Sequence, residues 1–194
     1  MWKLSVVAVA VGGLVLAPAL AIAQAKGGET GARHEFGVDL SLMYTKEGSG
    51  CSTDCSLFRA LTPVDVRIGF LSSGPLSVEP RFALSYITGG GAHLLQFTPG
   101  LNVLYGFGTR SGLHNSMGPY LTGGAALSLT HVGAGGTSTS ATQVSVNVGI
   151  GTRKAWGSAA FRPEAFFRYN FENSGKGIPA SFDLGARIGL SFFH

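Results

Sequence analysis

The stretch SFDLGARIGLSFF, residues 181–193, decides the fold because its side chains alternate in character with a period of two. That is the period of a β-strand whose two faces meet different surroundings. This strand is about twice as long as a usual strand in a globular protein. It is long enough to cross a bilayer, which takes roughly 9 to 11 residues of a tilted strand. The apolar face would carry Phe182, Leu184, Ala186, Ile188, Leu190 and Phe192, and the other face Ser181, Asp183, Gly185, Arg187, Gly189 and Ser191.

The same alternation recurs in seven earlier segments, at residues 36–44, 58–70, 76–86, 95–107, 121–130, 144–153 and 161–171. In each segment Phe, Leu, Val, Ile or Tyr occupy one face, and Gly, Ser, Thr, Asn or charged residues occupy the other. After Ala25 no apolar run reaches the length of a membrane-spanning helix, so a membrane-spanning chain must pair its backbone groups around a closed sheet. The sequence therefore predicts an all-β fold, a transmembrane eight-stranded antiparallel up-and-down β-barrel.

The first 25 residues have the features of a secretory signal peptide. Lys3 precedes an apolar run over residues 4–16, and Pro18 is followed by the small-x-small site Ala21-Ile22-Ala23. An uncleaved anchor helix is the alternative, because apolar residues continue for about 20 positions, enough to span a bilayer. Cleavage would leave residues 26–194 as one barrel domain.

Composition agrees with a barrel and argues against a nucleic-acid partner. The formal net charge is only +4, and removal of Lys3 lowers it by one unit. Charged residues make up 12% of the chain, about half the usual share, whereas glycine supplies 30 of 194 residues, about double the usual share. A barrel with lipid on the outside and a crowded lumen on the inside would account for both the low share of charged residues and the high share of glycine.

Alternation alone does not say which face points inward, because a soluble lipocalin-type barrel turns its apolar face inward. The interior of an eight-stranded barrel only has room for closely packed side chains, so the face rich in glycine, serine and threonine fits there better. The charged residues lie on that same face, and an arginine at the lipid midplane would cost about 2 to 4 kcal/mol. We therefore expect the apolar faces to meet lipid.

The inward face is expected to hold a network of charges, with arginine but no lysine as the cation. Guanidinium groups pair with carboxylates through two parallel hydrogen bonds, so a plug of salt bridges is the structural interpretation. A narrow ion path with anion preference is the functional alternative. The predicted lumen residues are Asp39, Arg59, Asp65, Arg67, Glu79, Arg81, Arg153, Arg162, Glu164, Arg168, Asp183 and Arg187.

The connections between segments alternate in length, as an outer-membrane barrel requires. Residues 72–75 and 155–158 are short enough for periplasmic turns, whereas residues 46–57, 133–141 and 172–179 are expected to be longer extracellular loops. Two connections depart from this rule. Residues 88–92 are short for an outer loop, and residues 108–118 are long for a periplasmic turn.

With these segments, the signal peptide and a terminal strand rich in phenylalanine, the whole mature chain resembles the small outer-membrane β-barrel family, which includes the OmpA transmembrane domain and OmpX. The resemblance implies a monomer in the outer membrane of a Gram-negative cell, in contact with lipid and lipopolysaccharide. It also implies that the barrel-assembly machinery reads the C-terminal strand. Here Phe193 and His194 follow Phe192, which departs from the family's terminal phenylalanine.

Few residues suggest a catalytic or binding site. Cys51 and Cys55 lie close together in the first outer loop, and in an exported protein we expect them to form a local disulfide. His114-Asn115-Ser116 loosely resembles the His-x-Ser dyad of outer-membrane lipid A deacylases, but no acidic residue stands nearby to orient the base. His93 and His131 are expected to be solvated structural residues at strand ends. No cofactor or metal site is predicted.

The sequence therefore favours a non-enzymatic outer-membrane barrel that serves the envelope structurally or binds a partner through its loops. A narrow porin-like channel and a lipid-modifying hydrolase stay open as alternatives. The fold resemblance does not choose among them, because one fold hosts many functions.

Overall fold

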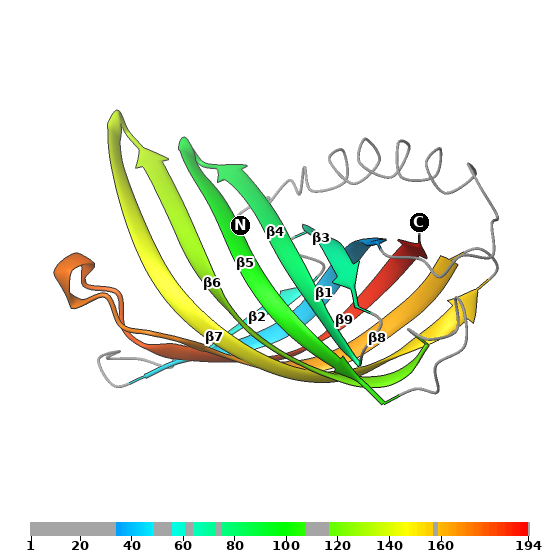
Figure 1. Ribbon diagram of the computed structural model, residues 1–194. Coiled ribbons are helices and arrows are strands. Elements are labelled where there is room, and N and C mark those ends of the chain that lie inside the picture. Colours follow the sequence, from blue (N-terminus) through cyan, green and yellow to red (C-terminus); the bar gives the residue numbers. More distant parts are fainter. Residues whose placement is uncertain are drawn as a thin grey trace.

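The computed structural model describes residues 34–48, 56–60, 64–72, 75–107, 117–156 and 159–193, almost entirely as strands of one sheet (Figure 1). A short 3-10 helix, η2 (Ser174–Lys176), lies in the connection before the last strand. The strands are β1 (His34–Glu47), β2 (Ser56–Ala60), β3 (Val64–Leu71), β4 (Leu76–Gly89), β5 (Ala92–Gly106), β6 (Gly118–Ala134), β7 (Thr137–Trp156), β8 (Ala159–Asn170) and β9 (Ser181–Phe193).

The sheet closes on itself, which confirms the predicted barrel. From β3 to β9 each strand pairs antiparallel with its neighbour in sequence, and β1 pairs with β9 from Glu35↔Phe193 to Glu47↔Ser181. Among the described residues, the ring of strands is complete where β3 pairs with both β1 and β4, and there it leaves no unpaired edge, as a sheet in lipid requires. The expected signal peptide lies outside the described residues, and within those residues no helix is long and apolar enough to cross a membrane.

The strand expected at residues 58–70 is described in two parts, on either side of residues 61–63. β2 and β3 lie end to end along the same side of β1, so together they take one of the eight places in the barrel. β1 has two residues between Asp39 and Leu42, but the chain opposite has four residues between Ala60 and Asp65. Pro63 falls in this interval, and proline has no N–H to donate to a β-ladder.

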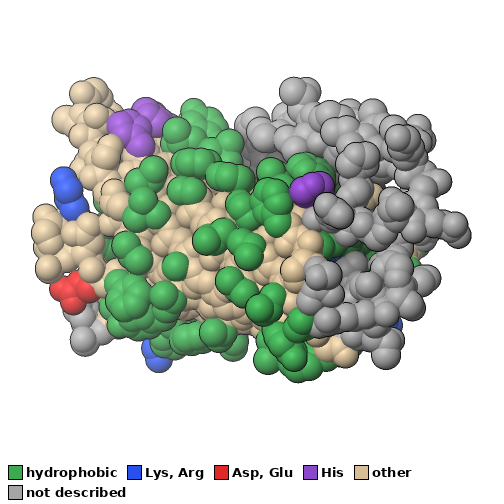
Figure 2. Space-filling model, in the orientation of Figure 1, with side chains coloured by type: hydrophobic (Ala, Val, Ile, Leu, Met, Phe, Trp, Pro, Cys, Tyr) green, Lys and Arg blue, Asp and Glu red, His purple; other side chains and the backbone are tan. Residues whose placement is uncertain are grey.

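The outer surface is an apolar belt, visible as the hydrophobic side chains spread over the middle of the barrel in Figure 2. Exposed aliphatic residues occur on every long strand, and aromatic residues gather toward both ends of the belt. Tyr86 and Tyr169 lie toward one end, and Tyr105 and Trp156 lie toward the other. Aromatic girdles of this kind mark the two membrane interfaces of transmembrane barrels.

The two ends of the barrel differ in their connections. At the end where β1 begins and β9 finishes, here called the terminal end, only residues 72–75 and 157–158 separate β3 from β4 and β7 from β8. The long connection expected at residues 108–118 falls almost wholly outside the described residues. At the opposite end, here called the hairpin end, η2 and the bridge Asn173↔Ile178 give the segment before β9 a compact form.

The prediction of a long loop at residues 133–141 is wrong. β6 continues to Ala134 and β7 begins at Thr137, so only Gly135 and Gly136 form the turn. Both glycines have positive φ, 57° and 82°, as the tight turn of a two-residue hairpin demands. Gly90 and Gly91 make the same kind of turn between β4 and β5, with φ of 61° and 78°.

These two hairpins project beyond the rest of the barrel as a four-stranded sheet, here called the projecting sheet (Figure 1). The pairing of β4 with β3 ends at Leu84↔Val64, and the pairing of β7 with β8 ends at Ser145↔Asn170. Within the described residues, positions 85–89 of β4 and 137–143 of β7 have no strand on their outer sides. Threonine and serine of β7 thus extend a strand where the sequence pattern indicated a loop.

The assignment of faces predicts that two arginine substitutions on β5 differ in effect. Leu101 is 52% exposed in the middle of the belt, so Leu101→Arg should destabilise the barrel by about 2 to 4 kcal/mol. Gln96 faces the lumen beside a cavity, so Gln96→Arg should cost less. Urea unfolding in lipid vesicles, followed by heat-dependent gel migration, measures both. Equal losses would contradict the assignment of faces.

Candidate functional site

The lumen of the terminal half is filled by an inner network of five buried charged side chains: Glu35, Arg67, Glu79, Arg153 and Arg162. They come from five different strands, and none is more than 3% exposed. Glu35 pairs with the guanidinium groups of Arg67 and Arg153, one on each carboxylate oxygen. One carboxylate therefore ties β1 both to its neighbour β3 and, across the barrel, to β7.

Glu79 is the second carboxylate of the inner network. Its Oε1 accepts hydrogen bonds from Arg153 Nη2 and Arg162 Nη1, both at 2.9 Å, and its Oε2 accepts from Arg162 Nη2 at 3.0 Å. The contact with Arg162 is the bidentate arrangement in which guanidinium and carboxylate planes match. A buried charge without such a partner would be far more costly.

A second group of ion pairs lies above the inner network, toward the hairpin end. Asp39 accepts from Arg67 Nε at 3.1 Å and from Arg81 Nη2 at 2.7 Å. Arg81 also pairs with Asp65, with Nη2 and Oδ2 separated by 2.6 Å. Asp39 is thus shared by two arginines, which connects this group to the inner network.

Aromatic rings support a third group around Glu164. Tyr120 donates its hydroxyl to Glu164 at 2.9 Å and accepts a hydrogen bond from Arg162 Nε at 2.7 Å. Arg187 Nη1 donates to Glu164 at 2.8 Å while its guanidinium carbon lies 4.2 Å from the centre of the Phe166 ring. Cation–π contacts of this kind favour a charge that has left water.

All the predicted lumen residues except Arg59 face the lumen and take part in an ion pair. Arg59 is opposite Met43 in the β1–β2 ladder, but its side chain lies outside the described part. Arg168 is the most solvent-exposed of these lumen residues, with 21% of its side chain exposed, and its Nη1 lies 3.7 Å from Asp183 Oδ2.

Three lumen residues of this site are missing from the sequence prediction. Glu35 precedes the first expected strand, and Tyr120 precedes the expected segment at 121–130, although parity alone would have put both on the inward face. Phe166 also has inward parity, between Glu164 and Arg168, but an aromatic residue suggested the lipid face. Extending each alternating segment by one residue would have found the first two.

The inclusion of Glu35 balances the described lumen charges. Six arginines, the predicted ones without Arg59, meet six carboxylates, the predicted five with Glu35. These residues therefore give the interior no excess positive charge to attract anions. They pair within the lumen instead.

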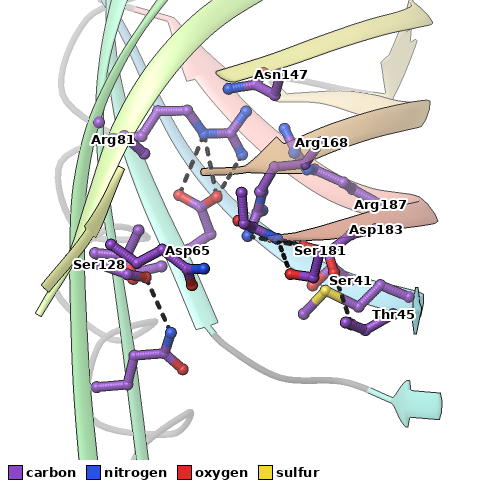
Figure 3. Close-up of a pocket in the computed structure, with 18 of the residues that line it drawn as sticks. Ser41, Thr45, Asp65, Arg81, Ser128, Asn147, Arg168, Ser181, Asp183 and Arg187 are labelled. Carbon is purple, nitrogen blue, oxygen red and sulfur yellow. Dashed lines mark hydrogen bonds and ion pairs between the residues drawn. The ribbon is translucent and has the colours of Figure 1, made fainter. Parts of the chain in front are cut away.

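Above the ion pairs, a cavity of about 170 Å³ occupies the lumen near the hairpin end (Figure 3). Asp65, Arg81 and Arg187 line it on the side of the network, and Ile178 and Pro179 of the connection before β9 also border it. Arg81 Nη1, Asn102 Nδ2 and Asn147 Oδ1 are buried around it with no partner among the described atoms. Such groups can bind water or a small polar solute.

The remaining sites predicted from the sequence are the disulfide and the His-x-Ser dyad. Cys51, Cys55 and the triplet His114-Asn115-Ser116 lie outside the described residues, so the disulfide and the dyad stay predictions. Among the residues that are described, no three His, Cys, Asp or Glu side chains gather in a way that could hold a metal ion.

Solved structures with the same fold support this architecture. The chain is similar to Neisserial surface protein A (NspA), with a TM-score of 0.52 and 17% identity over 83% of this chain and 98% of that one. It is also similar to Ail, the attachment invasion locus protein of Yersinia pestis, solved with the heparin analogue sucrose octasulfate. There the TM-score is 0.50, with 12% identity over 84% of this chain and 100% of that one.

The chain matches no protein-family model and none of the curated proteins. At such low identities the similarity to solved structures concerns the fold alone. It confirms the resemblance to small outer-membrane barrels, and the protein is an eight-stranded barrel of that architecture.

The pairing of Glu164 with Arg187 predicts that removing one partner is worse than removing both. Glu164→Gln should lower the free energy of unfolding by about 3 to 5 kcal/mol, because Arg187 would stay buried without a carboxylate. The double variant Glu164→Gln with Arg187→Met should recover more than half of that loss. Urea unfolding in lipid vesicles provides the measurement.

Arg168→Met serves as the control, because Arg168 is partly exposed and its pairing distance is long. Asp183 would keep its hydrogen bonds from Thr45 and Asn170, so this variant should lose clearly less stability than Glu164→Gln. Additive losses in the Glu164 and Arg187 double variant would contradict a pair of desolvated charges.

Proposed function

We propose that this protein is a non-enzymatic, non-conducting barrel of the outer membrane that presents its hairpin end to the cell exterior for interactions with external partners. The observation that carries the proposal is the inner network, because Glu35, Glu79 and their arginines fill the lumen with paired side chains. A closed lumen supports a scaffold role and argues against the porin-like alternative.

The projection of β4–β5 and β6–β7 beyond the rest of the barrel supports this orientation (Figure 1). In outer-membrane barrels the short turns face the periplasm and the longer extensions face outward, so the terminal end would be periplasmic. The projecting sheet and the segment around η2 would then stand outside the cell. Among the described residues, positions 85–89 of β4 and 137–141 of β7 pair with no strand on their outer sides, so they could offer main-chain hydrogen bonds to an external strand, a common mode of peptide recognition.

The apolar belt supports placement of the barrel in lipid, and the aromatic residues at both ends of the belt would contact headgroups or lipopolysaccharide. The closed ladder makes a monomer sufficient, because the described strands β1 and β3 to β9 pair in a complete ring. Assembly by the machinery that reads the C-terminal strand belongs to the same proposal.

Conductance tests the proposed closed lumen directly. In planar bilayers the purified wild-type barrel should show current near background, because the Arg162 contact with Glu79 spans the interior. The same preparation should release no fatty acid from lipopolysaccharide. A large, stable open conductance would replace the scaffold with a pore, and acyl release that is lost in a Ser116→Ala variant would replace it with a hydrolase.

Surface labelling tests the orientation. In a background with Cys51→Ser and Cys55→Ser, Ser138→Cys at the projecting sheet should react with a membrane-impermeant maleimide on intact cells. Ser72→Cys lies at the terminal end and is the matched control, since it should react only after the outer membrane is permeabilised. The reverse pattern would overturn the orientation, and recovery of the protein outside the outer-membrane fraction would contradict the membrane assignment.

A further inference from the structure

Two histidines lie next to each other on the outward face of the projecting sheet. His93 of β5 and His131 of β6 have ring centres 5.9 Å apart, with 35° between the ring planes. The ladder pairs His93 with Gly133 and Leu95 with His131, so the two histidines are diagonal neighbours on the same face. Figure 2 shows histidine side chains gathered at the edge of the hydrophobic belt, over the ends of these strands.

Gly133 permits this arrangement. A Cβ placed on Gly133 would lie 2.6 Å from Nε2 of His93, closer than real Cβ atoms come to another heavy atom. The imidazole of His93 therefore lies across the backbone of β6, over its cross-strand partner and toward His131. No larger residue at position 133 would leave the ring in this place.

His131 is oriented by a hydroxyl group. Its Nδ1 lies 2.9 Å from Oγ of Ser140, its cross-strand partner on β7. When Nδ1–H donates to this oxygen, the lone pair of the neutral ring is on Nε2. In metal sites a histidine ligand is held in the same way, with the second ring nitrogen bonded to a neighbouring polar group.

The separation of the two rings fits a shared ion. An ion about 2.1 Å from an imidazole nitrogen lies roughly 3 Å from the ring centre, so one ion between two rings separates their centres by roughly 5 to 6 Å. The observed distance of 5.9 Å falls in that range. Neutral imidazoles suit zinc, copper and nickel, whereas calcium and magnesium require oxygen ligands.

We propose that His93 and His131 form a binding site for a divalent transition-metal ion of the zinc, nickel and copper class at the outer rim of the barrel. No third His, Cys, Asp or Glu joins them among the described residues, so water completes the coordination. His93 is exposed, and the ion can exchange with the surroundings. The site is separate from the lumen, because both rings lie on the outward face.

Copper binding tests the site in the full-length protein, refolded in lipid nanodiscs without a histidine tag and with His114→Ala and His194→Ala in the background. Cu²⁺ should bind with one ion per barrel, and electron spin echo spectra should report two imidazoles. His93→Ala and His131→Ala should each weaken binding by about tenfold or more, and the double variant should add little, because both remove the same chelate.

Two further variants test the supporting residues. Ser140→Ala should weaken binding by about tenfold through loss of the oriented ring, and Gly133→Ala should do so by displacing His93. His34→Ala at the terminal end is the matched control and should bind as the parent does. A single imidazole in the spectra, or unchanged affinity in either His93→Ala or His131→Ala, would overturn the proposal, provided that gel migration shows a folded barrel.

Discussion

The constraint on which this structure depends is that each charge buried in a narrow lumen must meet an opposite charge. Arg153 and Glu35 are 118 positions apart in sequence, and Arg162 and Glu79 are 83 apart, yet each pair is in direct contact. Such contacts join strands that are not neighbours in the sheet. The backbone ladder closes the barrel, the number and stagger of its strands set the width, and the ion pairs connect strands that the ladder leaves apart.

Space imposes the second constraint, and it explains the high glycine content. Tyr120 is paired with Gly151, and Phe166 with Gly185, where a Cβ would lie only 2.7 Å from Cζ of the Phe166 ring. A large side chain can thus enter an eight-stranded barrel if its cross-strand neighbour has none. The inward face is therefore not uniformly small, as its composition suggested. It combines large and absent side chains at adjacent positions.

The sequence alone could predict the barrel and most of its inward charges, because a period of two is a local property of each strand. It could not predict that Arg162 meets Glu79 and Tyr120, since those contacts depend on the stagger of strands around the closed sheet. The projecting sheet was missed for another reason. Thr137 to Ser140 lie above the lipid, so they lack the apolar face by which membrane strands are recognised.

The contrast between the lipid-embedded strands and the projecting sheet suggests where this barrel can acquire binding specificity. Toward the terminal end, a substitution disturbs the apolar belt, the ladder or the ion pairs, so most changes cost stability. At the hairpin end the outward face changes from Tyr86 and Leu95 to Thr88 and His93, and neither lipid nor lumen packing restricts these positions. Chemistry can vary there at lower cost to the fold, because the buried ion pairs lie toward the other end of the barrel.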